Sequence, residues 1–156
     1  MSGKDSIYHL SGDEVVTRAL FTPSFFEEDG SLSPAAFHLH NLPNGPEKDI
    51  SVLRKTVEGY EERLASIANN PREENDVFCG TAELLTQDIK EIKIPSPNQT
   101  GVIVSSTRKN NVHASIYFCL NNTIVDARTS NSRIEFLAFA RKLVSIAQVE
   151  TAQNAS

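Results

Sequence analysis

Alternation of apolar and polar residues predicts β-strands through much of this chain, most clearly over Val112–Phe118. Residues i and i+2 of a strand point to the same face, so His113 and Ser115 are expected to project together. The opposite face of the strand would carry the apolar side chains of Ala114, Ile116 and Phe118. The pattern is that of a paired polar site on a sheet, or of the solvated side of a half-buried strand.

Further strands are predicted on both sides of this segment. β-branched residues favour a strand over Val15–Phe21 and a brief one over Ile50–Leu53. Later apolar segments that we expect to join the sheet are Val77–Leu85, Ile89–Ile94, Gly101–Val104 and Val112–Leu120. The last two are expected to pair in antiparallel fashion. Asn121-Asn122 then predicts a tight hairpin into Thr123–Val125.

Apolar residues at helical spacing predict two amphipathic helices. The first begins at Thr56 and ends at Asn69-Asn70-Pro71, and the charged segment Arg72–Asp76 after it is expected to be a solvated linker. The second closes the chain, where Ser132 and Glu135 have the spacing of a capping box. Its apolar stripe consists of Phe136, Phe139, Ala140, Leu143, Ile146 and Ala147. A short helical turn is also expected at Ser33-Pro34, because Ser is a preferred N-cap and Pro fits the first helical position.

Together these elements predict an α+β fold, a mostly antiparallel sheet with two amphipathic helices packed against it. A chain of 156 residues has the length of one domain. We expect this single α+β domain to span residues 13–150. A flexible lead-in over residues 1–12 and a disordered tail over residues 151–156 would flank it.

The charge of the chain narrows the classes of partner. Its net charge is −5 and its pI is near 5.4, and it has no basic cluster. These values argue against a nucleic acid or an anionic membrane as the main partner. The N-terminal residues show no apolar core of a signal peptide, and no apolar run has the length of a membrane span. A cytoplasmic location is therefore expected.

Neither a cofactor nor a metal is expected from the sequence. Cys79 and Cys119 lie in apolar, strand-like segments and are expected to be reduced core thiols. His38-Leu39-His40 has the H-x-H form and, with His113 and a cysteine, would nominate a metal site. The second closely spaced ligand pair typical of zinc sites is missing, however. The glycines form no phosphate-binding loop.

One segment suggests phosphoester chemistry. His113-Ala114-Ser115-Ile116 resembles one copy of the His-x-Ser/Thr-x motif that occurs twice in the two-histidine phosphoesterases. The resemblance implies one imidazole as base, another as acid, and hydroxyls that orient the phosphate. His38 or His40 would supply the first imidazole, but neither has a hydroxyl two residues later. The alternative is that His113 is an ordinary strand residue that donates to a backbone carbonyl.

Arg18 is the remaining candidate for a site. It lies on the first predicted strand, where it would meet an anionic ligand if that face of the strand lines a cleft. On the wet face of an antiparallel sheet it would be a solvated or ion-paired side chain instead. The candidate catalytic residues are therefore His113, Ser115, His38, His40 and Arg18.

The order of four segments resembles a family of small, uncharacterised bacterial proteins. These are the arginine strand Arg18–Pro23, the Asp-Gly-x-x-Ser-x-Ala-Ala-Phe segment Asp29–Phe37, the Ser-Val strand Ile50–Val52, and the His-Ala-x-Ile strand His113–Ile116. The resemblance implies a bacterial source and brings no activity with it. The positions that it marks for testing are Arg18, Ser33, Phe37, Ser51 and His113.

Two functions of different classes remain open. The first is a small cytoplasmic bacterial protein that acts by binding a protein partner, in an operon-encoded conflict or defence system, with its closing helix as the docking face. The incomplete catalytic constellation favours this function. The second is a nucleotide- or phosphoester-handling enzyme that uses His113 and Ser115 with His38 or His40. The enzyme would be favoured if those imidazoles faced each other across an open cleft, with Arg18 or Ser115 beside them. The oligomeric state stays open.

Overall fold

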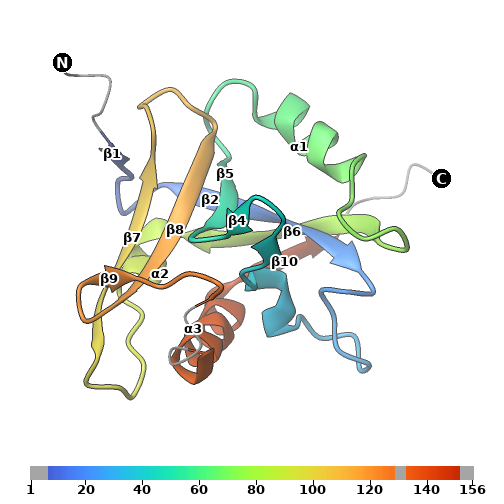
Figure 1. Ribbon diagram of the computed structural model, residues 1–156. Helices are drawn as coiled ribbons and strands as arrows, with labels where there is room; N and C mark the ends of the chain where they lie inside the picture. Colours follow the sequence, from blue (N-terminus) through green and yellow to red (C-terminus); the bar gives the residue numbers. More distant parts are fainter. Residues whose placement is uncertain (1–6, 129–132, 152–156) are drawn as a thin grey trace.

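An antiparallel sheet of eight strands forms the centre of the computed structural model, which describes residues 7–128 and 133–151 (Figure 1). Seven strands follow one another in the order β1 (Tyr8–His9), β7 (Gln99–Ser106), β8 (His113–Leu120), β5 (Ile50–Arg54), β2 (Val15–Thr22), β6 (Val77–Leu85) and β10 (Gln148–Thr151). The eighth, β9 (Thr123–Ile124), pairs with the end of β8. Every strand pair described is antiparallel, so the predicted α+β fold with a mostly antiparallel sheet is confirmed.

Helices cover both faces of the sheet, with α1 above and α3 below it in Figure 1. The helical elements are the 3-10 helix η2 (Pro34–Phe37), α1 (Tyr60–Ala68), α2 (Thr86–Lys90) and α3 (Arg133–Ile146). A separate hairpin pairs β3 (Asn41–Leu42) with β4 (Gly45–Pro46). Val52 lies in the main core with η2, α2 and α3, whereas its neighbour Leu53 packs with α1. Adjacent residues of β5 thus face opposite layers, as the pleat of a strand requires.

Most of the predicted strands are present. The strands predicted from Val15, Ile50 and Val77 correspond to β2, β5 and β6, and the predicted pair is β7 with β8. The predicted hairpin is also confirmed, because both of its asparagines have positive φ, 51° at Asn121 and 64° at Asn122. These angles belong to the two-residue turn that matches the twist of paired strands.

Two segments differ from the prediction. Helix α1 begins at Tyr60 rather than at Thr56, because Gly59 has a φ of 95°, which a right-handed helix cannot contain. The segment Ile89–Ile94 is not a strand: it contains the end of α2 and a turn, and its isoleucines are buried in the core. The Gln99 side chain accepts from the Ile94 amide and donates to the Ile92 carbonyl. These backbone groups therefore have hydrogen-bond partners without pairing to another strand.

The boundaries of the domain also differ from the prediction. Residues 1–6 and 152–156 lie outside the described residues, but the described part of the expected lead-in joins the sheet as β1. Leu10 is buried in the main core, so the domain begins before residue 13. Thr151 is the last residue of β10. Ser132 of the predicted capping box lies outside the described residues, and Glu135 instead accepts from the Ser96 hydroxyl.

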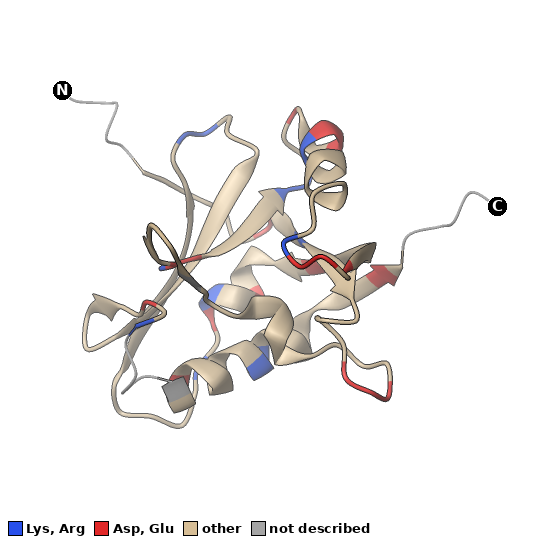
Figure 2. Cartoon of the chain, turned by 45° about the vertical axis from the view of Figure 1, so that its right-hand side comes forward, with Lys and Arg blue, Asp and Glu red and all other residues tan. Residues whose placement is uncertain are grey.

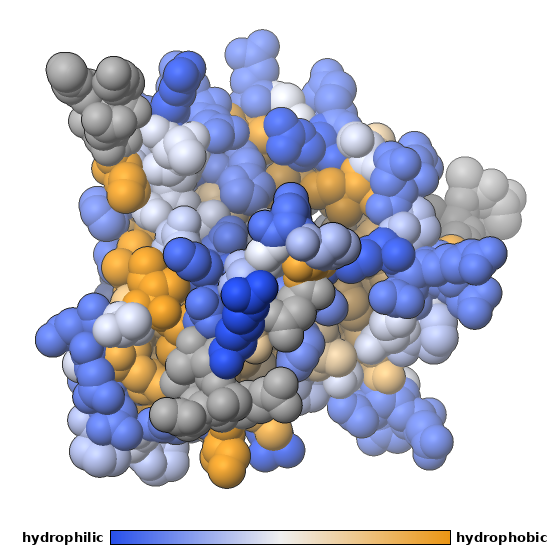
Figure 3. Space-filling model, in the orientation of Figure 1, coloured by the Kyte–Doolittle hydropathy of each residue, from blue (hydrophilic) through white to orange (hydrophobic). Residues whose placement is uncertain are grey.

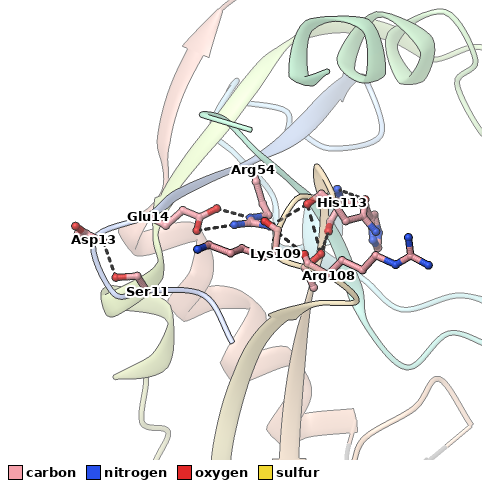
Figure 4. A network of polar contacts seen from close by, with 9 residues as sticks. Ser11, Asp13, Glu14, Arg54, Arg108, Lys109 and His113 are labelled. Atoms are coloured by element: carbon pink, nitrogen blue, oxygen red, sulfur yellow. Dashed lines mark hydrogen bonds and ion pairs between the residues drawn. The ribbon is translucent and has the colours of Figure 1, made fainter. Parts of the chain in front are cut away.

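A buried arginine fixes the start of β8, where His113 lies (Figure 4). Arg54 binds both carboxylate oxygens of Glu14 and donates to the carbonyls of Lys109, at 2.7 Å, and Asn111, at 3.0 Å. The Asn111 side chain in turn accepts from the His113 amide at 3.1 Å. Charge-assisted bonds of this kind are the stronger ones in proteins. The loop between β7 and β8 is therefore attached to β5 and to the chain before β2.

Candidate functional site

A cavity of about 480 Å³ opens where strands β2 and β5 separate. The two strands pair only at Val16 with Arg54 and Thr17 with Leu53, although β2 continues to Thr22. The cavity is lined by residues of β2, β5 and β8, by the end of α1, and by segments that follow β2, η2 and α1. Its volume lies in the range of small-molecule sites.

Four of the five candidate residues line this one cavity: Arg18, His38, His40 and His113. Ser51, which the family resemblance marked, lies among them. Ser115 is absent from the lining, and its hydroxyl donates to the Asp49 carboxylate at 2.6 Å. Ser33 caps η2 by accepting from the Ala35 amide, and Phe37 is fully buried in the core. Those last two residues serve the fold.

Arg18 bridges the split between the strands. Its Nε donates to the Ala36 carbonyl and its Nη1 to the Ser51 carbonyl, both at 2.8 Å. The guanidinium also lies over the Phe25 ring, 5.7 Å from its centroid. Burial lowers the pKa of Arg18 to about 10, and the charge of Glu47 opposes this shift. The group is still a cation at neutral pH, and its position is fixed by two backbone carbonyls.

Glu47 holds a second cation and an imidazole at the cavity. Its Oε1 accepts from the His40 amide at 2.8 Å and lies 3.1 Å from His40 Nδ1, and its Oε2 accepts from Arg72 at 3.2 Å. Burial opposes ionisation of Glu47, but the hydrogen bonds from His40 and the charge of Arg72 outweigh it and lower the pKa. Arg72 Nη1 lies 2.7 Å from His40 Nδ1, so both protonation states of the ring have a partner there.

The other two histidines of the cavity are His38, in the segment after η2, and His113, on β8. His38 and His40 flank Leu39, which is buried in the core, and their rings meet edge to face at 5.5 Å between centroids. His113 Nε2 lies 3.2 Å from the Ser51 hydroxyl oxygen. Burial lowers the pKa of His113, with Asp49 opposing the shift. At neutral pH the ring is therefore neutral and can accept a proton.

Residues 72–75 are exposed, as a solvated linker predicts, but Asp76 at the end of this segment is not. Asp76 is buried and accepts from the backbone amide and the hydroxyl of Ser24. Arg72, Glu73 and Asp76 all line the cavity, and Figure 2 shows basic and acidic positions side by side in this segment after α1. A run of charged residues does not indicate which distant segment of the chain will fold against it. The roles of Glu47, Arg72 and Asp76 therefore had no signal in the sequence.

The cavity lining combines two guanidinium groups and three imidazoles with the carboxyl groups of Glu73 and Asp76. The guanidinium groups and imidazoles suit an anion that undergoes proton transfer. Across the described ranges, no group of three or more His, Cys, Asp or Glu side chains is arranged to hold a metal ion. Within the same ranges no helix is both long and apolar enough to cross a membrane. A scan against protein-family models and searches of curated proteins and of solved structures found no match to this chain.

Proposed function

We propose that the protein handles phosphoesters and binds a small phosphate-bearing ligand in the cavity between β2 and β5. One observation carries the proposal: the half-buried Arg18 guanidinium lies in the same cavity as His38, His40 and His113. A guanidinium matches the geometry of phosphate oxygens, and charge-assisted bonds to it are stronger than neutral ones.

The bonding of Arg18 supports this function. Of the five N–H donors of a guanidinium, one on Nε and one on Nη1 donate to the Ala36 and Ser51 carbonyls. Among the described residues Nη2 has no hydrogen-bond partner, so its donors remain for a ligand. Arg72 supplies a second cation at the same cavity. A ligand with two or more anionic oxygens satisfies both groups, as a phosphate ester does.

The size and wall of the cavity favour an ester over free phosphate. A volume of about 480 Å³ leaves room for an organic group the size of a nucleoside beside the phosphate. Phe21 and Phe25 also line the cavity, with their rings edge to face at 5.8 Å. Such an aromatic wall favours a planar or apolar body on the ligand.

Calorimetric titration with inorganic phosphate and with adenosine monophosphate tests this function. We expect both to bind, the nucleotide more tightly, and Arg18→Gln to weaken binding about 10- to 100-fold, the loss typical of a charge-assisted contact. Arg108→Gln is the matched control, because Arg108 is an exposed arginine that does not line the cavity.

Two further readouts complete this test. Arg18→Lys keeps the charge and should bind with intermediate affinity. The melting temperature of each variant shows whether the fold is intact. No binding to the wild-type protein, or equal binding by Arg18→Gln, would contradict the proposal.

Docking to a protein partner is the second function that we propose, and exposed apolar residues on α3 support it. The aromatic stripe predicted for this helix packs into the core, where Phe139 stacks on Phe118 at 4.5 Å. Ile134 and Leu137 face outward, 84% and 42% exposed. Figure 3 shows apolar side chains in separate patches, over β7 and β9 and at the lower edge near α3. A bacterial source, a cytoplasmic location and a conflict or defence setting stay predictions.

A further inference from the structure

We propose that Ser51 is a nucleophile that accepts a phosphoryl group from the ligand, with His113 as its general base. This inference rests on the proposed phosphoester function and names the chemistry of the same cavity.

The first observation is the distance between the two groups. Ser51 is exposed, lines the cavity, and has its Oγ 3.2 Å from His113 Nε2, within reach of a proton transfer. His113 pairs with Leu53, which lies two residues after Ser51 on β5. His113 and Ser51 are therefore diagonal neighbours on strands β8 and β5. The neutral imidazole accepts the hydroxyl proton, since burial lowers the pKa of His113.

The second observation is that the Ser51 backbone is held in place. Its neighbours Ile50 and Val52 are each 2% exposed in the main core. Its own carbonyl accepts from Arg18 Nη1 at 2.8 Å. The hydroxyl is therefore attached to a rigid strand, and the guanidinium that would bind the phosphate contacts the carbonyl of the same residue. A nucleophile, its base and a cation held by fixed elements are the parts that such chemistry needs.

Ser115 provides the contrast within the same pair of strands. It lies directly opposite Ser51 in the ladder, but its hydroxyl donates to Asp49 at 2.6 Å and the residue is only 8% exposed. Two serines on adjacent strands thus have different surroundings, one open to the cavity beside an imidazole and one buried against a carboxylate. Ser115 is a matched internal control for Ser51.

The proposed reaction has two balanced steps. First, Ser51 Oγ attacks phosphorus, its proton passes to His113 Nε2, and the bond from phosphorus to the ester oxygen breaks. The leaving alkoxide takes a proton from a water molecule. The hydroxide that this leaves attacks the phosphoserine, while Ser51 Oγ leaves and regains its proton from His113. One water is consumed, and an alcohol and inorganic phosphate are released.

Labelling with diisopropyl fluorophosphate tests this inference without a known substrate. A nucleophilic serine forms a bond to phosphorus and releases fluoride, and intact-mass and peptide mass spectrometry then locate the adduct. We expect one adduct, on Ser51, in the wild-type protein and in Ser115→Ala, and none in Ser51→Ala. His113→Gln should slow labelling about 100-fold or more, the usual contribution of a general base. Melting temperatures confirm that each variant is folded.

The outcomes separate this inference from the proposed function. An adduct on Ser51 that depends on His113 supports the nucleophile. No adduct on Ser51, or equal labelling of His113→Gln, overturns it, and phosphate binding in the calorimeter would then leave the proposed function standing. An adduct on Ser51 in a protein that binds neither phosphate nor the nucleotide would overturn the proposed function instead.

Discussion

At the scale of single residues, two arginines on adjacent strands have different roles because their hydrogen bonds differ. Arg54 is 4% exposed and uses all three of its nitrogens on Glu14 and on loop carbonyls. Arg18 uses Nε and Nη1 on two carbonyls, and Nη2 has no partner among the described residues. A guanidinium that the fold satisfies at every nitrogen is structural. One with donors left over beside a cavity can bind a ligand.

His113 gives a prediction about pH at the same scale. Burial lowers its pKa below the ordinary 6.5, so the unfolded chain takes up this proton at a higher pH than the folded protein does. The free energy of unfolding contributed by His113 should therefore fall as the pH drops below about 6.5. It should level off once the folded protein is protonated as well.

Urea denaturation of the wild-type protein and of His113→Asn at several pH values between 7.5 and 5 measures this contribution. The difference between the two proteins removes the titration of all other groups. We expect that difference to shift in favour of the variant as the pH falls. A shift in favour of the wild-type protein would mean that the folded state stabilises the imidazolium, and that would contradict a lowered pKa of His113.

At the scale of elements, Gly59 decides where α1 begins. Its φ of 95° is in the left-handed region, and a Cβ placed there would meet no atom within 4 Å. Gly59→Ala should therefore destabilise the protein by about 1–2 kcal/mol, the backbone cost of that conformation for a residue with a Cβ. Gly59→Asn should cost less, because asparagine tolerates the region better. Equal stability of all three proteins in urea would contradict this account of the start of the helix.

The elements that depend on local signals are the ones that the sequence could predict. Alternation located β8 and put His113 and Ser51 on strands, and the asparagine pair specified its own turn. The sequence also singled out Arg18 and the histidines as chemistry-bearing residues. It could not show that β2 and β5 separate after Thr17. That separation gives the cavity, and it depends on tertiary packing rather than on the composition of either strand.

At the scale of the whole molecule, the separation of β2 from β5 divides the sheet into two parts. One part contains β1, β7, β8 and β5, and the other contains β2, β6 and β10. Two residue pairs, the hydrogen bond from the Lys55 amide to the Val15 carbonyl, and the side chains of Arg18 and Arg54 connect them. The parts run in different directions, with β7 and β8 steep and β2, β6 and β10 nearly level in Figure 1. Arg18 comes from one part, and Ser51 and His113 come from the other.

A ligand held by both parts should stabilise their junction, and this gives the last prediction. A ligand at 100 times its Kd contributes about 2.7 kcal/mol to stability, provided that it binds only the folded state. Amides beside the split exchange through local opening. Adenosine monophosphate should therefore slow amide hydrogen exchange in both Arg18–Phe21 and Ile50–Val52, while the edge strand β10 keeps its rate. Arg18→Gln should abolish the slowing in both segments together. Slowing confined to one segment would place the ligand on one part of the sheet, and Ser51 could not then attack a phosphate that Arg18 holds.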